Sequence, residues 1–243
     1  MQTWGLTDQG NIREQNQDSY AIVPFGRDRV LMIVCDGMGG AKSGNVASAL
    51  AVEVFTDEVR RTQKPAMTAE KAARMLRGAL ELANRAVYEQ SQLSEDFTGM
   101  GTTLVAAWLS RDLAVIVNVG DSRAYHFTKE DVSLVTRDHS MVAYMVERGE
   151  LTQEQAKLHP GKNVITRAVG TEPEVEGDIF ICKLRKDECL LLCSDGLSNE
   201  MADQEMLFEV VHGINKSDCC QRLLHIAKKR GAPDNVTVAL AMV

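Results

Sequence analysis

The apolar positions of the chain change their period from one segment to the next. A continuous apolar run from Val30 to Cys35 predicts a strand covered on both faces, since a strand with one wet face would alternate. The run ends at Asp36-Gly37, and three more glycines precede a segment with helical spacing. A carboxylate beside glycines, which let a backbone approach a ligand, makes residues 29–47 a candidate site.

The remaining segments predict further helices and strands. Helical spacing extends over 45–61 and 68–91, with Thr68 as the N-cap of the second helix. A period of two then predicts one antiparallel meander over 103–109, 113–119, 124–128 and 132–136. Other strands are predicted over 2–8, 19–25, 178–184, 189–194 and 236–243, and other helices over 140–158 (two short ones joined at Gly149), 203–213 and 217–229.

This order of elements predicts a layered α+β fold. Two central, mostly antiparallel sheets would stack face to face with a helix pair outside each, giving an α/β/β/α sandwich. The length of 243 residues, without repeats or a linker, predicts one domain over residues 1–243.

Composition narrows the function classes. The net charge is 27 − 34 = −7, which argues against a general nucleic-acid surface. No apolar stretch approaches the ~18–20 residues of a membrane span, and the N-terminus has no signal-peptide pattern. The six cysteines form no C-x-x-C pair, and several lie in apolar runs, so we expect reduced thiols in a cytoplasmic protein. A single compact domain suggests a monomer, and the chain can still be part of a longer protein.

The glycine loop after Asp36 does not match three common phosphate motifs. A dinucleotide fingerprint requires glycine where Lys42 stands, and a P-loop requires Gly-Lys-Ser/Thr, whereas Ala41 precedes Lys42. An aspartyl-nucleophile phosphatase would carry a second aspartate at position 38, which is Met38. Two readings remain: a metal-binding Asp36 with the Gly37 carbonyl as a further ligand, or a tight turn with a solvent-facing aspartate.

Four aspartates lie where an apolar strand meets a glycine- or asparagine-containing turn. They are Asp36, Asp121, Asp195 and Asp234. Aspartate favours turns, but four like charges gathered at one sheet end repel each other unless a cation compensates. Oxygen ligands without His or Cys suit Mg²⁺ or Mn²⁺, and two such ions can activate water and clamp a phosphoryl group. Arg13, near Asp18 on the first polar loop, has the planar fork that binds phosphate, although it can equally be a surface arginine.

Seven short motifs, in order along the chain, closely resemble the metal-dependent type 2C protein serine/threonine phosphatases, with the bacterial single-domain branch as the nearest match. They are Arg13-x-x-Asn16-Gln17-Asp18, Cys35-Asp36-Gly37-Met38-Gly39-Gly40, Gly101-Thr102-Thr103, Asn118-Val-Gly-Asp121-Ser122-Arg123, Ile165-Thr-Arg-Ala-Val-Gly170, Cys193-Ser-Asp195-Gly196-Leu197 and Pro233-Asp234-Asn235-Val236-Thr237.

The resemblance implies a role for each motif. Asp36, Asp195 and Asp234 would bind two catalytic Mn²⁺ or Mg²⁺ ions, with Asp36 bridging them and the Gly37 carbonyl contributing. Asp18 would complete the site or hold metal-bound water. A water bridging the metals would attack phosphoserine or phosphothreonine in proteins, namely those modified by a partner serine/threonine kinase.

The same resemblance implies two further sites. Arg13 would grip the substrate phosphate, and Asp121 with Asp195 would match a third, weaker metal. Residues around 145–170 would form a flap beside the active site.

The chain departs from the resemblance in the glycine loop. Met38 and Ala41 stand where relatives place a histidine that could act as general acid, and Asn45 replaces a commonly acidic residue. His139, in Arg-Asp-His-Ser, is interpreted as structural. We therefore expect the leaving group to take its proton from metal-bound water, substrate or solvent.

Three functional hypotheses follow. The first is an active metal-dependent phosphoprotein phosphatase. The second is a non-catalytic phosphoprotein-binding module on the same fold, which the missing histidine favours but the retained carboxylates oppose. The third is an α+β domain whose aspartates are ordinary turn residues, which the number of ordered motif matches makes the weakest.

Overall fold

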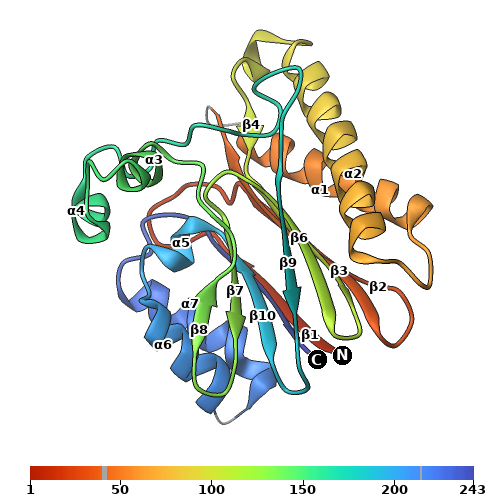
Figure 1. Ribbon diagram of the computed structural model, residues 1–243. Helices are drawn as coiled ribbons and strands as arrows, with labels where there is room; N and C mark the ends of the chain where they lie inside the picture. The colour runs from red at the N-terminus through yellow and green to blue at the C-terminus, as the bar shows by residue number, and fades with distance from the viewer. Residues whose placement is uncertain (40–42, 214) are drawn as a thin grey trace.

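The computed structural model describes residues 1–39, 43–213 and 215–243. Over these residues the strands form two antiparallel sheets that face each other (Figure 1). The first sheet has the order β1 (Gln2–Asp8), β11 (Val236–Met242), β10 (Cys189–Cys193), β7 (Arg123–Phe127) and β8 (Val132–Leu134). The second has the order β2 (Asp18–Pro24), β3 (Arg29–Met38), β5 (Leu104–Ser110), β6 (Leu113–Val119) and β9 (Asp178–Lys183), with β4 (Gly101–Thr102) paired to β3.

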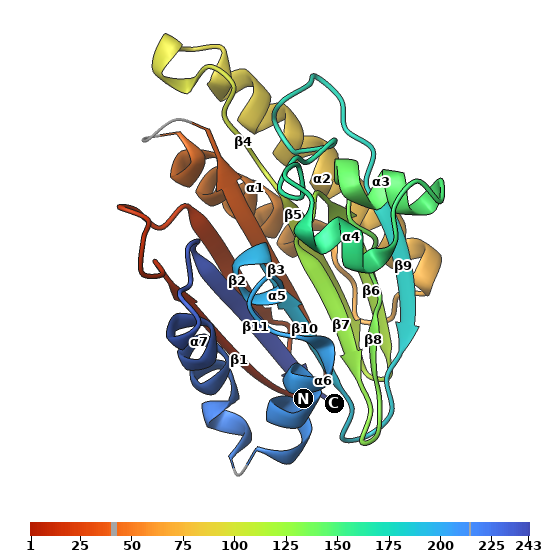
Figure 2. The same ribbon diagram turned by 90° about the vertical axis from the view of Figure 1, so that its left-hand side faces the viewer.

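Helices cover the outer face of each sheet, so the expected α/β/β/α sandwich is confirmed. The long helices α1 (Gly44–Thr62) and α2 (Ala69–Ser91) pack on the second sheet, as Figure 2 shows from the side. The first sheet is covered by α6 (Asp203–Leu207), a π-helical turn η2 (Phe208–His212) and α7 (Cys219–Lys229). Shorter elements are η1 (Glu95–Phe97), α3 (Met141–Glu147), α4 (Gln153–Leu158), α5 (Asp195–Ser198) and η3 (Lys216–Asp218).

Strand β3 explains why its sequence lacks alternation. All residues from Val30 to Cys35 are buried, but neighbours face different cores. Leu31 and Ile33 pack under α1 and α2, whereas Met32 packs between the two sheets. The predicted strand with two covered faces is therefore confirmed, and it is a central strand of the sandwich.

The second helix begins as predicted. The Thr68 hydroxyl accepts a hydrogen bond from the Lys71 amide at 3.4 Å, which satisfies one of the free N–H groups of the first turn. Below it, α2 is amphipathic and buries a small-residue face that includes Ala72, Ala79 and Ala83.

Two sequence predictions about the strands were wrong. The four strands expected as one meander divide between sheets, because β5 and β6 belong to the second sheet and β7 and β8 to the first. The link at Gly120 therefore carries the chain across the sandwich instead of closing a hairpin. Strand β3 also does not stop before Asp36, but continues to Met38 by pairing with β4.

The C-terminal helices also differ in detail from the prediction. The helix predicted over 203–213 is α-helical only to Leu207 and then widens to a π-helical turn, which ends at His212. Among the described residues, no helix combines the length and the apolar run needed to cross a membrane.

Candidate active site

Aspartates from both sheets meet at one end of the sandwich. Asp18 at the start of β2 lies directly opposite Asp36 in the β2–β3 register. Asp195 is the first residue of α5, just after β10, and Asp234 lies just before β11. Like charges placed opposite each other in a sheet repel, so this register has an energetic cost unless protons or cations compensate it.

Asp18 is the most buried of these carboxylates. Its Oδ2 accepts hydrogen bonds from the Ser194 hydroxyl at 2.7 Å and the Thr237 hydroxyl at 2.6 Å. Its Oδ1 is buried and has no hydrogen-bond partner among the described residues. Burial raises the pKa of Asp18 to about 7, since the charges of Asp195 and Asp234 add to it while the two hydroxyls oppose it.

Asp36 and Asp195 share this environment. Burial, followed by the charges of Asp18 and Asp195, raises the pKa of Asp36 well above its usual range. Burial, followed by the charge of Asp234, also raises the pKa of Asp195. The Asp195 Oδ2 accepts a hydrogen bond from the Asn199 side chain at 3.0 Å, whereas its Oδ1 is buried without a partner among the described residues.

Asp121 joins the same cluster from the crossing between β6 and β7. Burial, followed by the charges of Asp195 and Asp138, raises its pKa to about 7. We call Asp18, Asp36, Asp121 and Asp195 the inner carboxylates. The pKa of each of them is raised, as expected for clustered carboxylates whose burial and mutual repulsion outweigh the nearby positive charge of the chain.

Asp234 differs because a cation of the chain reaches it. The Arg13 guanidinium donates to Asp234 Oδ2 at 2.6 Å, and the Arg13 side chain remains half exposed. The hydrogen bond from Arg13 to Asp234 raises the pKa of the arginine. Burial opposes this rise, and the charges of Asp36 and Asp195 add to it. The structure thus places Arg13 at the mouth of the cluster.

Gly37 and Gly44 bring two backbone segments into close contact beside Asp36. A Cβ atom on Gly37 would collide with the Gly44 carbonyl, and one on Gly44 would come within 2.8 Å of the Gly37 carbonyl oxygen. The Gly37 amide donates to the Gln17 carbonyl at 3.1 Å. Glycine is therefore required at both positions by packing, whatever else the Gly37 carbonyl does.

Asn235 fixes the shape of the first polar loop. Its side-chain amide donates to the carbonyls of Gln9 and Gln15, at 2.9 Å each, and its oxygen accepts from the Gln17 amide at 2.8 Å. One buried side chain thus holds both ends of the loop that carries Arg13 against the segment that carries Asp234.

Several polar residues that support the aspartates were not assigned roles from the sequence. Thr103 accepts from the Asp36 amide through its hydroxyl and donates to the Asp36 carbonyl through its own amide, both at 2.9 Å. Ser194 and Thr237 hold Asp18, as described above. The available signal was a hydroxyl residue inside an otherwise apolar strand, as at Thr237, where burial requires a partner.

The glycine-loop departures are only partly visible. Ala41, together with Gly40 and Lys42, lies outside the described residues. Met38 ends β3, and Asn45 is exposed near the start of α1. Among the described residues, no histidine is a leading influence on the pKa values of the inner carboxylates.

The donor set fits divalent cations of the hard, oxygen-preferring class. The inner carboxylates offer only oxygen, and two of their oxygens are buried without partners. In the described residues no three His, Cys, Asp or Glu side chains form a ready-made shell around one ion. Mg²⁺-like ions characteristically keep several water ligands and take only one or two carboxylates each, so a sparse protein shell agrees with that class.

Comparison with known proteins now decides the family. The model of the family described as protein phosphatase 2C matches residues 11–230. The chain belongs to the protein phosphatase 2C family. It is 37% identical over 234 residues to the serine/threonine phosphatase stp of Listeria welshimeri, covering 96% of this chain and 92% of that protein.

Solved structures of type 2C phosphatases have the same fold. Serine/threonine phosphatase Stp1 from Staphylococcus aureus superposes with a TM-score of 0.92 at 35% identity, covering 99% of this chain and 94% of that one. The catalytic domain of the serine/threonine protein phosphatase PstP, solved with two manganese ions, gives 0.86 at 31% identity, covering 99% and 97%. The phosphatase described here is therefore an enzyme of this family, and its inner carboxylates lie on the family's fold.

Proposed function

We propose that this phosphatase hydrolyses phosphoserine and phosphothreonine monoesters in proteins. The observation that carries the proposal is the cluster of inner carboxylates, drawn from both sheets, whose pKa values are raised and two of whose oxygens are buried without a hydrogen-bond partner among the described residues. Its relatives bear the name serine/threonine phosphatase, which supports the substrate class. No observation favours the non-catalytic alternative.

Two divalent ions, Mn²⁺ or Mg²⁺, would be held by Asp36, Asp195 and Asp234, with the Gly37 carbonyl as an additional oxygen ligand. Manganese is supported by the PstP structure with two such ions. When bound, the ions supply Lewis-acid activation of water and neutralise phosphate charge. Asp18 would complete this site, since its Oδ1, which has no hydrogen-bond partner among the described residues, belongs to the same carboxylate cluster. Asp121 with Asp195 would hold a third, weaker ion.

Arg13 would bind the substrate phosphate. Its half-exposed guanidinium already contacts Asp234 at the mouth of the cluster, and a planar fork can donate to two phosphate oxygens at once. Binding there would orient the phosphorus above the inner carboxylates while the Asp234 contact holds the arginine in place. The proton for the leaving alkoxide would come from water or substrate, because Met38 offers no acid.

The wider setting belongs to the same proposal. All six cysteines are free and five of them are buried, which supports a reducing cytoplasmic compartment. Residues 1–243 would act as one catalytic domain and as a monomer, with a flap over residues 145–170. Its substrates would be a partner serine/threonine kinase and the proteins that this kinase phosphorylates.

The decisive experiment measures hydrolysis of p-nitrophenyl phosphate and a phosphothreonine peptide with Mn²⁺, with Mg²⁺ and with EDTA. We expect hydrolysis with metal only. Asp36→Asn should lower kcat/KM by about 10³-fold or more, because a ligand shared by two ions supplies several kcal/mol of stabilisation. The matched control is Asp57→Asn, an exposed aspartate on α1 paired with Arg60. Activity that survives EDTA or Asp36→Asn would refute the two-metal assignment.

A further inference from the structure

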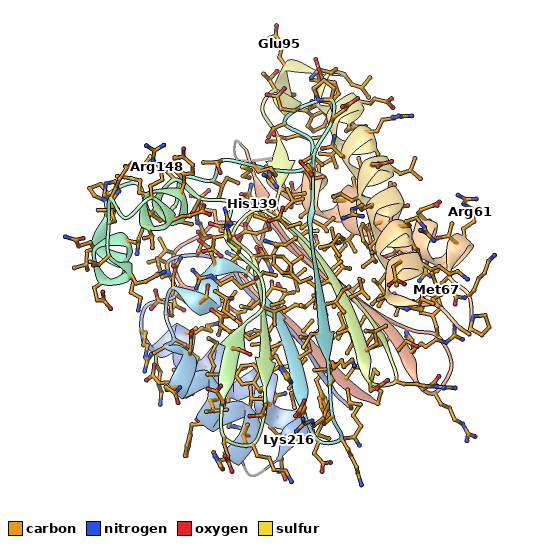
Figure 3. All side chains as sticks on the ribbon, viewed as in Figure 1. Arg61, Met67, Glu95, His139, Arg148 and Lys216 are labelled. Atoms are coloured by element: carbon orange, nitrogen blue, oxygen red, sulfur yellow. The ribbon has the colours of Figure 1, made fainter. Side chains whose placement is uncertain are left out.

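His139 forms two hydrogen bonds with the backbone of Gly120, the residue just before Asp121. The His139 amide donates to the Gly120 carbonyl at 2.9 Å, and the Gly120 amide donates to His139 Nδ1 at 3.1 Å. One residue thus contacts both backbone groups of Gly120, and the Asn118 side-chain amide also donates to the Gly120 carbonyl at 3.3 Å. Figure 3 shows His139 in the interior, where the chain leaves the strands toward α3.

The hydrogen bond from the Gly120 amide to Nδ1 determines the tautomer of the imidazole. Nδ1 accepts from Gly120, so the ring proton resides on Nε2, which donates to Asp178 Oδ2 at 3.3 Å. Arg167 then cannot donate to that nitrogen, although it lies beside it; its Nη1 donates to Asp178 Oδ1 and to the Glu176 carbonyl instead. Burial lowers the pKa of His139, although the contact with Asp178 opposes this, so the fold favours the neutral ring.

Gly120 itself contacts the inner site. Its φ of +100° suits glycine, and a Cβ there would come within 2.7 Å of the Thr103 side chain. Thr103 is the residue whose hydroxyl accepts from the Asp36 amide, and the same hydroxyl contacts Ser122 at 2.7 Å. The backbone on both sides of Asp121 is therefore held, by His139 before it and through Ser122 after it.

We propose that His139 is a positioning residue that holds Asp121 in the orientation needed to bind the third, weaker metal ion, and that it ties this site to the base of the flap. The inference rests on the proposed function, because it concerns an ion of that site.

The flap connection follows from the backbone around His139. Its carbonyl accepts from the Thr166 amide at 2.8 Å, and the next residue, Ser140, forms a β-bridge with Ile165. The two chain segments that enter and leave the flap are thus paired at His139. Through Asp178, at the start of β9, the ring is also anchored to the second sheet.

Two substitutions separate the two halves of the imidazole. In His139→Asn, the side-chain oxygen can occupy the place of Nδ1 and accept from Gly120, while the Asp178 contact is lost. In His139→Gln, the amide nitrogen can reach Asp178 from the place of Nε2, while the acceptor for Gly120 is lost. If the hydrogen bond from Gly120 to His139 positions Asp121, the asparagine variant keeps binding of the third metal ion and the glutamine variant does not.

The experiment titrates each variant with Mn²⁺ alone by calorimetry. We expect His139→Gln to raise the Kd of the weakest Mn²⁺ site by about tenfold, the usual effect of replacing a residue that supports a metal ligand. The Kd values of the tighter sites should not change. His139→Asn should stay within about threefold of the parent protein. In an Asp121→Asn background the glutamine substitution should have no further effect on Mn²⁺ binding, because the ligand that it positions is gone.

His126→Gln is the matched control. His126 is also a histidine paired with a carboxylate, Glu188 at 2.8 Å, but it belongs to a different contact on β7. Its titration should match the parent, and thermal unfolding in EDTA confirms that each variant folds. If His139→Gln misfolds, His139→Asn still tests the inference, because a loss of more than about threefold in its weakest Mn²⁺ affinity would contradict it.

Three results would overturn the inference while the proposed function stands: a parent protein that binds only two Mn²⁺ ions, a glutamine variant with the parent isotherm, or an asparagine variant as weak as the glutamine one. A parent protein that binds no Mn²⁺ would instead refute the proposed function itself.

Discussion

Asp8 and Asp18 begin and end the same polar loop, yet their surroundings are opposite. Asp8 pairs with Lys228 at 2.9 Å, and although burial opposes it, that contact and the Gly10 amide lower the pKa of Asp8. Asp18 accepts from two hydroxyls and pairs with no cation among the described residues, and burial raises its pKa to about 7. The fold thus places lysine and arginine in contact with the aspartates at the rim, whereas burial dominates at the inner carboxylates, which we propose bind cations from solution.

The largest effect is expected when Mn²⁺ is added to the protein at two pH values and thermal unfolding is measured. The pKa values of Asp18 and Asp121 are raised to about 7, above the unfolded value of 3.8, so their destabilising effect is complete above pH 7 and absent below about pH 4. Mn²⁺ at 100 times its Kd should add about 2.7 kcal/mol, or about 5–10 °C in Tm, at pH 8. Protons compete at pH 5.5, so the shift should shrink. An equal shift at both pH values in thermal scans would contradict the comparison.

The next effect concerns Asp18 without metal. Asp18→Asn removes an uncompensated charge and keeps an acceptor for Ser194 and Thr237, so it should stabilise the metal-free protein at pH 8 by on the order of 2 kcal/mol. The gain should fade toward pH 4, where Asp18 is protonated in the folded state. Thermal unfolding in EDTA measures this, and a destabilised variant at pH 8 would show that the inner charge is compensated by other means.

Arg13 tests the boundary between rim and interior. Arg13→Lys keeps the charge near Asp234 but loses the planar fork, so kcat/KM for a phosphothreonine peptide should fall by about tenfold. Mn²⁺ affinity should change little, because the charge is retained. Arg60→Lys, an exposed pair on α1, is the control for arginine replacement in general. A variant with undiminished kcat/KM would remove Arg13 from phosphate binding.

The smallest effect is expected at the rim. Asp8→Asn retains the contact with the Gly10 amide and loses only a partly exposed ion pair with Lys228. Such pairs contribute less than about 1 kcal/mol, which urea unfolding can resolve against Asp28→Asn, whose partner Arg111 is mostly exposed. A gain in stability would place Asp8 with the inner carboxylates instead, and a loss above about 2 kcal/mol would show that the pair contributes more than an exposed ion pair does.

The local pattern of the chain predicts much of this architecture. The apolar run in β3 and the N-cap at Thr68 are local features, and both predictions are confirmed. The division of the meander between sheets could not be predicted, because a period of two shows that one face is buried but does not say against which sheet. The turn at Gly120 has the same composition whether it closes a hairpin or crosses the sandwich.

The gathering of the aspartates could be predicted from the sequence, whereas the residues that hold them could not. Aspartates at strand ends mark themselves by following an apolar run, as Asp36 does. The hydroxyls of Ser194 and Thr237 reach Asp18 only because β10, β11 and β2 meet at one end of the sandwich. Contacts between segments more than 170 residues apart have no local signal, so they require the fold.

Asn235 has a consequence for which sequences the loop can tolerate. Its side chain makes two donations and one acceptance in a buried place between three backbone groups. Aspartate has no donor to replace the amide, and glutamine is one carbon too long for the same geometry. Residues 11–14 are by contrast largely exposed, and the loop's ends are held through its backbone. In a library randomised across both segments and selected for activity, we therefore expect varied loop sequences but only asparagine at position 235. The shape of the loop at the active site thus depends on a residue outside the loop.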